Sequence, residues 1–340
     1  MSIKKEILSL ASSGRKIKTD DIVSKYKVSR QYVNTIINPL VKQGVLTKVG
    51  STKNAFYISP KHRELLDERV VKRLENKNLK DYEVFEQVDR QMHLKELIGE
   101  DLHSILYYAF TEMMNNAMDH SESKNIQVEI GKGDNLYFYV NDVGIGVFRN
   151  IMKKRGLKNE LEAIQDLLKG KMTTMPQAHS GEGIFFTSKI ADVFVLESFN
   201  LKLTIDNRIK DVFLEELKPS KKGTKVYFSI AINSKKHLED VFKKYHANPE
   251  DVEEFDKTEI LIKLYTKGTI HISRSQAKRV TVGLEKFKLV ILDFDQVPTI
   301  GQAFADEIFR VFQKRHPNMK IVAINMNEAV QFMVERVKKI

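Results

Sequence analysis

Residues 136–146 read L-Y-F-Y-V-N-D-V-G-I-G, a strand pattern that runs directly into the motif D-x-G-x-G. Apolar side chains alternate with tyrosines along the strand part, which is the period expected of a half-buried strand. Asp142 stands at the end of this strand, and Gly144 and Gly146 follow at alternate positions. Glycines most often serve turns, so the motif alone is a weak signal. Its meaning depends on the segments on either side of it.

Upstream, a long helix is predicted from about Glu100 to Ser121, followed by a strand-like run at 126–130. Glu112 and Asn116 are separated by four residues in this helix, so they project from the same face. Downstream, an insertion at 147–178, containing a loop and a helix, leads to Ser180-Gly181-Glu182-Gly183 and a second helix. Gly223-Thr224 then forms a predicted turn that enters another strand.

The four motifs, a helical E-x-x-x-N, D-x-G-x-G, G-x-G and G-T in that order, resemble the GHKL ATPases. This family includes histidine kinases, gyrase and the anti-sigma-factor kinases, and the likeness covers about residues 97–232. The resemblance implies a Bergerat-type α/β sandwich that binds ATP with Mg²⁺. It assigns the magnesium ion to the side-chain oxygen of Asn116 and the role of catalytic base to Glu112.

The resemblance also assigns the remaining nucleotide contacts. Asp142 would accept the amino group of adenine, supported by Thr224, while Gly144 and Gly146 keep the strand end open. Ser180, Gly181 and Gly183 would bring backbone amides to the phosphates at a helix N-terminus. The S-G-E-G-I box has Phe185 in place of a third glycine and looks closest to anti-sigma-factor serine kinases. The insertion would form the lid over ATP, with Lys169, Lys171, Thr173 and Thr174.

The first sixty residues carry 11 basic and 3 acidic side chains, which accounts for most of the net charge of +11. They read as three short helices and a β-hairpin, with Thr19 or Asp20 as a cap of the second helix and Ser29 as a cap of the third. Gly44 is expected to end the third helix. The segment from Val28 to Leu46 resembles the winged helix–turn–helix domains of bacterial transcription regulators.

This likeness implies contact with DNA through outward side chains of the third helix and of the wing. The residues are Arg30, Gln31, Tyr32, Asn34, Thr35, Lys48 and Lys53. A winged helix used only for protein contact is the alternative. Residues 60–96 are expected to be a charged helical connector whose apolar positions Leu65, Leu66, Val70 and Leu74 favour a packing seam, and a homodimer remains open. His62 is a poor match to a histidine-kinase acceptor.

The last hundred residues alternate strand and helix patterns, which indicates an α/β layer. The segment L-D-F-D-Q-V-P-T-I-G-Q-A-F at 292–304 resembles STAS-like domains, the fold of anti-anti-sigma factors. In those proteins a Ser or Thr after the strand is phosphorylated by a GHKL partner, and Thr299 occupies that position. Two interpretations stay open for Thr299, a helix N-cap and a candidate phospho-acceptor.

The composition excludes several classes of function. The chain has no cysteine, so it cannot form disulfides, zinc–thiolate sites or a catalytic thiol. It shows neither a signal-peptide pattern nor a run of about 18 apolar residues, and a cytoplasmic protein without membrane contact is expected.

Together, these patterns predict an α+β multidomain chain. The expected parts are a winged helix at 1–59, the connector at 60–96, the GHKL domain at 97–233 and a STAS-like α/β domain at 234–340. The predicted function is ATP-dependent control of DNA binding. Two alternatives remain: an anti-sigma-type serine/threonine kinase acting on its own or a partner's STAS domain, and an ATP-gated scaffold for protein contacts.

Overall fold

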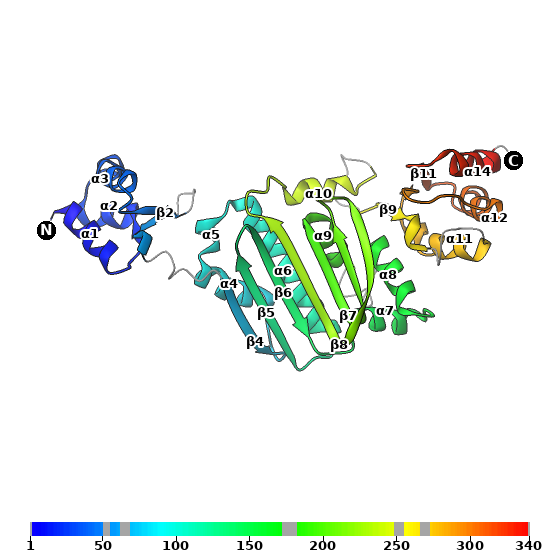
Figure 1. Ribbon diagram of the computed structural model, residues 1–340, viewed down its shortest axis with the longest axis horizontal. Helices are drawn as coiled ribbons and strands as arrows, with labels where there is room; N and C mark the ends of the chain where they lie inside the picture. The colour runs from blue at the N-terminus through cyan, green and yellow to red at the C-terminus, as the bar shows by residue number, and fades with distance from the viewer. Residues whose placement is uncertain are drawn as a thin grey trace. The chain divides into compact units, whose positions relative to one another are not determined.

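The computed structural model describes residues 2–49, 55–61, 69–171, 182–247, 255–265 and 273–338 (Figure 1). The chain is mixed α and β and divides into two compact units. One unit comprises Met1–Gly144, Ala191–Leu196 and Lys225–His237, and the other comprises Ile145–Ile190, Glu197–Thr224 and Leu238–Ile340. Among the described residues, no helix is long and apolar enough to cross a membrane.

The N-terminal residues form the three helices and the hairpin that the sequence predicts. The elements are α1 (Ile3–Ser12), β1 (Ile17–Lys18), α2 (Thr19–Tyr26), α3 (Arg30–Lys42), β2 (Thr47–Val49) and β3 (Phe56–Ile58). The Ser29 hydroxyl accepts a hydrogen bond from the Tyr32 amide at 3.2 Å and caps α3. Gly44 follows that helix with a φ of +70°, a conformation that glycine adopts without strain.

The start of α2 differs from the expectation. Neither Thr19 nor Asp20 caps this helix, because its N-cap is Lys18, which makes no capping hydrogen bond through its side chain. Residues 17 and 18 pair with 57 and 56 as strand β1. The helix therefore begins directly at the end of a strand, and Thr19 becomes its first, buried residue.

The expected helical connector is wrong between residues 69 and 75. Arg69–Glu75 is strand β4, which pairs antiparallel with β5 (Asn125–Lys132). Val70 is buried and Val71 is 44% exposed, which is the alternation of a strand. Val70 and Leu74 are four residues apart, a spacing that puts two side chains on one face of a helix and also on one face of a strand. Leu65 and Leu66 lie outside the described residues.

The largest sheet of the described residues has five strands, in the order β4-β5-β6-β8-β7. Its other strands are β6 (Asn135–Asp142), β7 (Val193–Asp206) and β8 (Asp211–Ala231), and β6 is antiparallel to both β5 and β8. Helices α4 (Asp81–Met92), α5 (Leu94–Leu97) and α6 (Glu100–His120) precede β5. Phe110 of α6 packs on Phe138 of β6, whose ring stacks on Phe228 of β8 at 4.9 Å. The long helix α6 therefore covers one face of the sheet (Figure 1).

The predicted turn at Gly223-Thr224 is absent, because β8 continues through both residues. Gly223 has a φ of +82° inside this strand. A glycine can leave the extended conformation for one residue without ending the ladder on either side. The same unit contains α7 (Val147–Arg155) and α8 (Glu160–Lys169) of the insertion, followed by α9 (Gly183–Ile190) and α10 (Leu238–Lys244).

The C-terminal residues form the alternating α/β layer that the sequence predicts, referred to below as the C-terminal layer (described residues 255–265 and 273–338). Strands β9 (Lys257–Leu261), β10 (Leu289–Asp293) and β11 (Lys320–Ile324) are parallel, with β10 in the middle. The helical elements are η2 (Ile262–Tyr265), α11 (Arg274–Thr281), η3 (Leu284–Lys286), α12 (Gln302–Asp306), η4 (Glu307–Phe312), α13 (Gln313–Arg315) and α14 (Glu328–Lys338). Residues 302–315 are continuously helical, with a π-helical middle.

Candidate functional site

Glu112 and Asn116 lie on α6, one turn apart and both half-buried. The Asn116 side-chain nitrogen donates to the Glu112 backbone carbonyl at 2.9 Å. Because the nitrogen is used in this hydrogen bond, the amide oxygen is the atom of this side chain that a hard cation such as Mg²⁺ would take. The residue at position 116 is therefore compatible with the magnesium role that the resemblance implies. No cluster of three His, Asp or Glu side chains suited to a metal occurs in the described part of the chain.

Asp142 ends strand β6 as a buried carboxylate, with only 4% of its surface exposed. Its Oδ1 atom accepts a hydrogen bond from the Gly144 amide at 2.8 Å, which holds the side chain across the turn that follows the strand. The next amide back, that of Val143, donates to the Ser123 hydroxyl at 3.2 Å. Ser123 follows the end of α6, so its hydroxyl connects the segment after α6 to the end of β6 by a hydrogen bond. No local sequence pattern indicates this contact of Ser123.

Gly144 lies against the end of α6. A Cβ atom on Gly144 would be 1.8 Å from the Ser121 carbonyl oxygen. The glycine is needed because two backbone segments touch here, and protein atoms fill the space that a side chain would take. The absence of a side chain at Gly144 thus allows the end of α6 to pack on the D-x-G-x-G turn, in addition to any role toward a ligand.

Gly144→Ala is expected to destabilise the fold by at least about 3 kcal/mol, because the contact is to backbone and cannot relax by a rotamer change. Chemical denaturation of the purified variant measures this loss. Gly133→Ala is the matched control on the β5–β6 hairpin, since its Cβ would meet nothing within 4 Å. Equal stability of the two variants would contradict the close backbone contact.

Gly146 and Thr224 belong to the second unit, together with the insertion. Gly146 has a φ of +81°, and a Cβ there would be 2.5 Å from the Ser198 hydroxyl and 2.7 Å from the Phe199 ring. Thr224 is buried, and its hydroxyl accepts the amide of Val147, the first residue of α7, at 2.9 Å. Both residues therefore shape the start of the insertion. Their expected roles, an open strand end at Gly146 and support of the Asp142–adenine contact by Thr224, remain predictions.

Gly183 is the first residue of α9, as expected for a glycine that leads into a helix. Ser180 and Gly181 lie outside the described residues, as do Thr173 and Thr174. Phe185, which replaces the third glycine of the fuller motif, is 2% exposed. Its ring lies 4.8 Å from Phe255 and 4.9 Å from Tyr245. Position 185 is thus used for packing.

Lys169, which the resemblance places in a lid over ATP, is buried and bonded within the protein, and the lid itself stays a prediction. Its side chain is 1% exposed, and its ammonium donates to the carbonyl oxygens of Arg279 and Val282 at 3.0 and 2.7 Å. Lys171 donates to the Lys286 carbonyl at 3.4 Å. Both lysines bind the C-terminal layer, a partner that no local pattern indicates.

The expected DNA-binding side chains of α3 are largely exposed. Gln31, Thr35 and Tyr32 are on the surface, with Tyr32 53% exposed, and Asn34 is partly buried. Arg30 is exposed and pairs with Asp20 at 2.9 Å, a surface ion pair that costs little to open. Lys48 is exposed on β2, and Lys53 and His62 lie outside the described residues.

Thr299 lies between β10 and α12 and is partly exposed. The interpretation of Thr299 as a helix N-cap is wrong, because the N-cap of α12 is Gly301 and has no side chain to bond. The helix begins two residues later than a Thr299 cap requires. Within the part of the chain that the structure describes, the Thr299 hydroxyl makes no hydrogen bond.

Comparison with known proteins bears on the C-terminal layer. A family described as "STAS-like domain of unknown function (DUF4325)" matches residues 276–331. This range runs from α11 through β10 and β11 into α14. Neither the curated proteins nor the solved structures gave a match. The chain therefore contains a STAS-like domain in its C-terminal part.

Proposed function

We propose that this chain binds ATP and uses the bound nucleotide to control DNA binding. The observation that carries the ATP proposal is the buried Asp142 carboxylate, which the Gly144 amide holds at the end of β6. A buried carboxylate is costly unless it is hydrogen-bonded, so such a group at a strand end is a candidate for ligand recognition. The amino group of adenine is a donor that suits it.

The other motif residues supply the chemistry that a triphosphate needs. The Glu112 carboxylate, on the same face of α6 as Asn116, would orient the attacking water and accept its proton. Asn116 would hold Mg²⁺ through its amide oxygen, and the ion, when bound, would neutralise phosphate charge. Gly183 begins a helix whose free amides and dipole favour an anion.

The N-terminal elements from α1 to β3 support the proposed binding of DNA. Their helices surround a core of Ile7, Val33 and Ile37, and the polar side chains of α3 are left on the surface. An excess of basic residues beside an exposed helix of this kind suits the phosphates and base edges of a major groove. ATP would act by changing the relative populations of conformations that differ in DNA affinity.

Glu112→Ala is expected to leave ATP affinity nearly unchanged and to slow ATP hydrolysis about 10²–10⁴-fold, the usual contribution of a general base. Calorimetric titration measures the affinity, and release of labelled phosphate measures the turnover. Glu100→Ala, an exposed change in the first turn of the same helix, is the matched control. Equal hydrolysis rates in the wild type and Glu112→Ala would leave Glu112 without a catalytic role.

Phosphoryl transfer to protein is the second candidate function, and the Thr299 hydroxyl favours it. Thr299 is partly exposed, and its hydroxyl makes no hydrogen bond within the described residues. Phosphopeptide mapping after incubation with Mg-ATP tests this function. Thr299→Ser retains an acceptor and Thr299→Val removes it, while Glu112→Ala should stop the transfer. If residue 299 of the wild type carries no phosphate, phosphoryl transfer to Thr299 is wrong, and ATP hydrolysis or ATP binding without transfer remains.

A further inference from the structure

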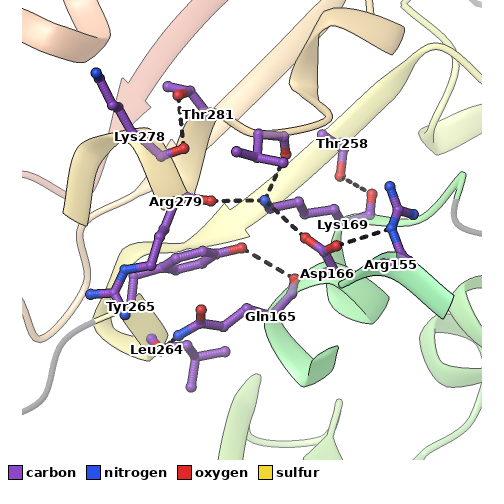
Figure 2. Close-up of polar contacts among 11 residues, drawn as sticks. Arg155, Gln165, Asp166, Lys169, Thr258, Leu264, Tyr265, Lys278, Arg279 and Thr281 are labelled. Carbon is purple, nitrogen blue, oxygen red and sulfur yellow. Dashed lines mark hydrogen bonds and ion pairs between the residues drawn. The ribbon is translucent and has the colours of Figure 1, made fainter. Parts of the chain in front are cut away.

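The end of α8 is bound to the C-terminal layer by a buried lysine. The Lys169 ammonium donates to two backbone carbonyls, Arg279 and Val282, and pairs with Asp166 at 3.4 Å (Figure 2). Asp166 in turn pairs with Arg155 of α7 at 3.5 Å. These side chains join both helices of the insertion to a helix that follows more than a hundred residues later in the chain. We refer to this set of interactions as the Lys169 contact.

The two acceptors explain why a lysine is stable in this position. Arg279 is in the last turn of α11 and Val282 is its C-cap, so their carbonyls belong to the group that a helix end leaves without internal partners. A cation is also favoured at this end of the helix dipole. Burial lowers the pKa of Lys169, and Asp166 opposes that shift. Lys169 therefore caps a helix of the STAS-like domain from a different element.

Further hydrogen bonds hold the C-terminal end of α8. The Thr258 hydroxyl, fully buried on β9, donates to the Lys169 backbone carbonyl at 2.7 Å. The Gln165 side chain donates to the Leu264 carbonyl at 2.7 Å, and the Tyr265 hydroxyl donates to the Gln165 carbonyl at 3.2 Å. Side chain and backbone of α8 are thus both bonded to the C-terminal layer (Figure 2).

Helix α9 is held by the same layer through aromatic rings. Phe255, which precedes β9, lies 4.8 Å from Phe185 and 5.0 Å from Phe186, and it contacts Phe287 at 5.5 Å. Gly170, which ends α8, has a φ of +76°, and a Cβ on it would be 2.6 Å from the Phe255 ring. The helix that begins with the motif residue Gly183 therefore packs directly on the C-terminal layer.

We propose that the C-terminal layer, which includes the STAS-like domain, positions helices α8 and α9 for the nucleotide, and that Lys169 is the positioning residue between them. This inference rests on the proposed binding of ATP. Helices that are fixed before the ligand arrives need no ordering on binding, so the Lys169 contact raises ATP affinity. By linkage, bound ATP stabilises the contact by the same factor. A partner that rearranges the STAS-like domain would then change ATP occupancy.

The test compares four variants of the full chain by two measurements. Lys169→Met keeps a chain of similar length but cannot donate to the two carbonyls. Thr258→Val removes the hydrogen bond to the Lys169 carbonyl and leaves the lysine unchanged. Lys169→Arg keeps the charge and the donors, and Lys154→Met is the control on an exposed residue of α7. Hydrogen exchange of α8 and α11 reports on the contact, and calorimetric titration with Mg-ATP reports the affinity.

In both Lys169→Met and Thr258→Val, we expect α8 and α11 to exchange at least about fivefold faster and ATP to bind at least about fivefold more weakly, the lower end of typical couplings between sites. Lys154→Met should match the wild type, and Lys169→Arg should recover most of the affinity. Unchanged ATP affinity in variants whose exchange has increased would overturn the inference alone. A wild-type chain that binds no ATP would overturn the proposed function, and this inference with it.

Discussion

Replacing Asp142 by asparagine is expected to weaken ATP binding at least about a hundredfold. The carboxylate can accept a hydrogen bond from the amino group of adenine, whereas an asparagine that keeps its oxygen toward the Gly144 amide presents its own amino group to the base. Two donors then face each other in a buried place, and a charge-assisted hydrogen bond worth about 1.5–3 kcal/mol is lost as well. Titration calorimetry with Mg-ATP measures the change.

The substitution should leave the fold intact, because the asparagine oxygen can still accept the Gly144 amide. Thermal unfolding of Asp142→Asn without nucleotide checks this point. Asp134→Asn is the matched control, since Asp134 is exposed in the turn between β5 and β6. If Asp142→Asn binds ATP as tightly as the control does, the adenine assignment of Asp142 is wrong.

Removing residues 1–58 is expected to lower DNA affinity at least about a thousandfold, the usual range between specific and non-specific binding. The deletion removes helix α3 with its exposed polar side chains and most of the excess positive charge of the chain. A gel shift at several salt concentrations measures the effect. In the full chain, affinity should fall steeply as salt increases, because each phosphate contact releases a counterion.

A milder variant separates loss of binding from loss of folding. Leu97 packs against a cluster of Val49, Phe56 and Ile58. The deletion removes this cluster and exposes Leu97, so it takes away a folding contact together with the DNA-binding helix. Lys48→Ala leaves this cluster in place and should weaken DNA binding to a similar extent for every sequence, with a salt slope smaller by about 1. ATP affinity should not change in either variant. DNA binding that survives the deletion would move the interface to another part of the chain.

The sequence contained enough information for the elements that depend on local patterns. Ser29 and Gly44 mark the ends of α3 because a cap hydroxyl and a left-handed glycine act within a few residues of the helix that they terminate. The alternation at 136–140 marked β6 correctly, and the alternating strand and helix patterns of the last hundred residues marked the α/β layer. The position of Asp142 at the end of β6 was predicted on the same grounds, and its role toward ATP stays a prediction.

Local patterns were insufficient where one spacing fits two structures or where a partner lies far along the chain. Val70 and Leu74 have a spacing that suits a helix and a strand alike, and pairing with β5 decided for the strand. Thr299 resembles a helix cap in sequence, but the chain runs two residues further before α12 begins. Gly144 reads as a turn residue, and only the approach of the Ser121 backbone shows the second reason for a glycine.

Lys169 and Phe185 illustrate the same limit at the candidate site. In sequence Lys169 is an ordinary charged residue at the end of a helix, because the carbonyls that receive its hydrogen bonds are 110 and 113 residues further along the chain. Phe185 reads as a departure from a glycine motif until Phe255 is seen against it. A sequence records which residues prefer burial or a partner. The identity of that partner is decided when the chain folds, because only packing brings distant backbone carbonyls and rings within contact distance.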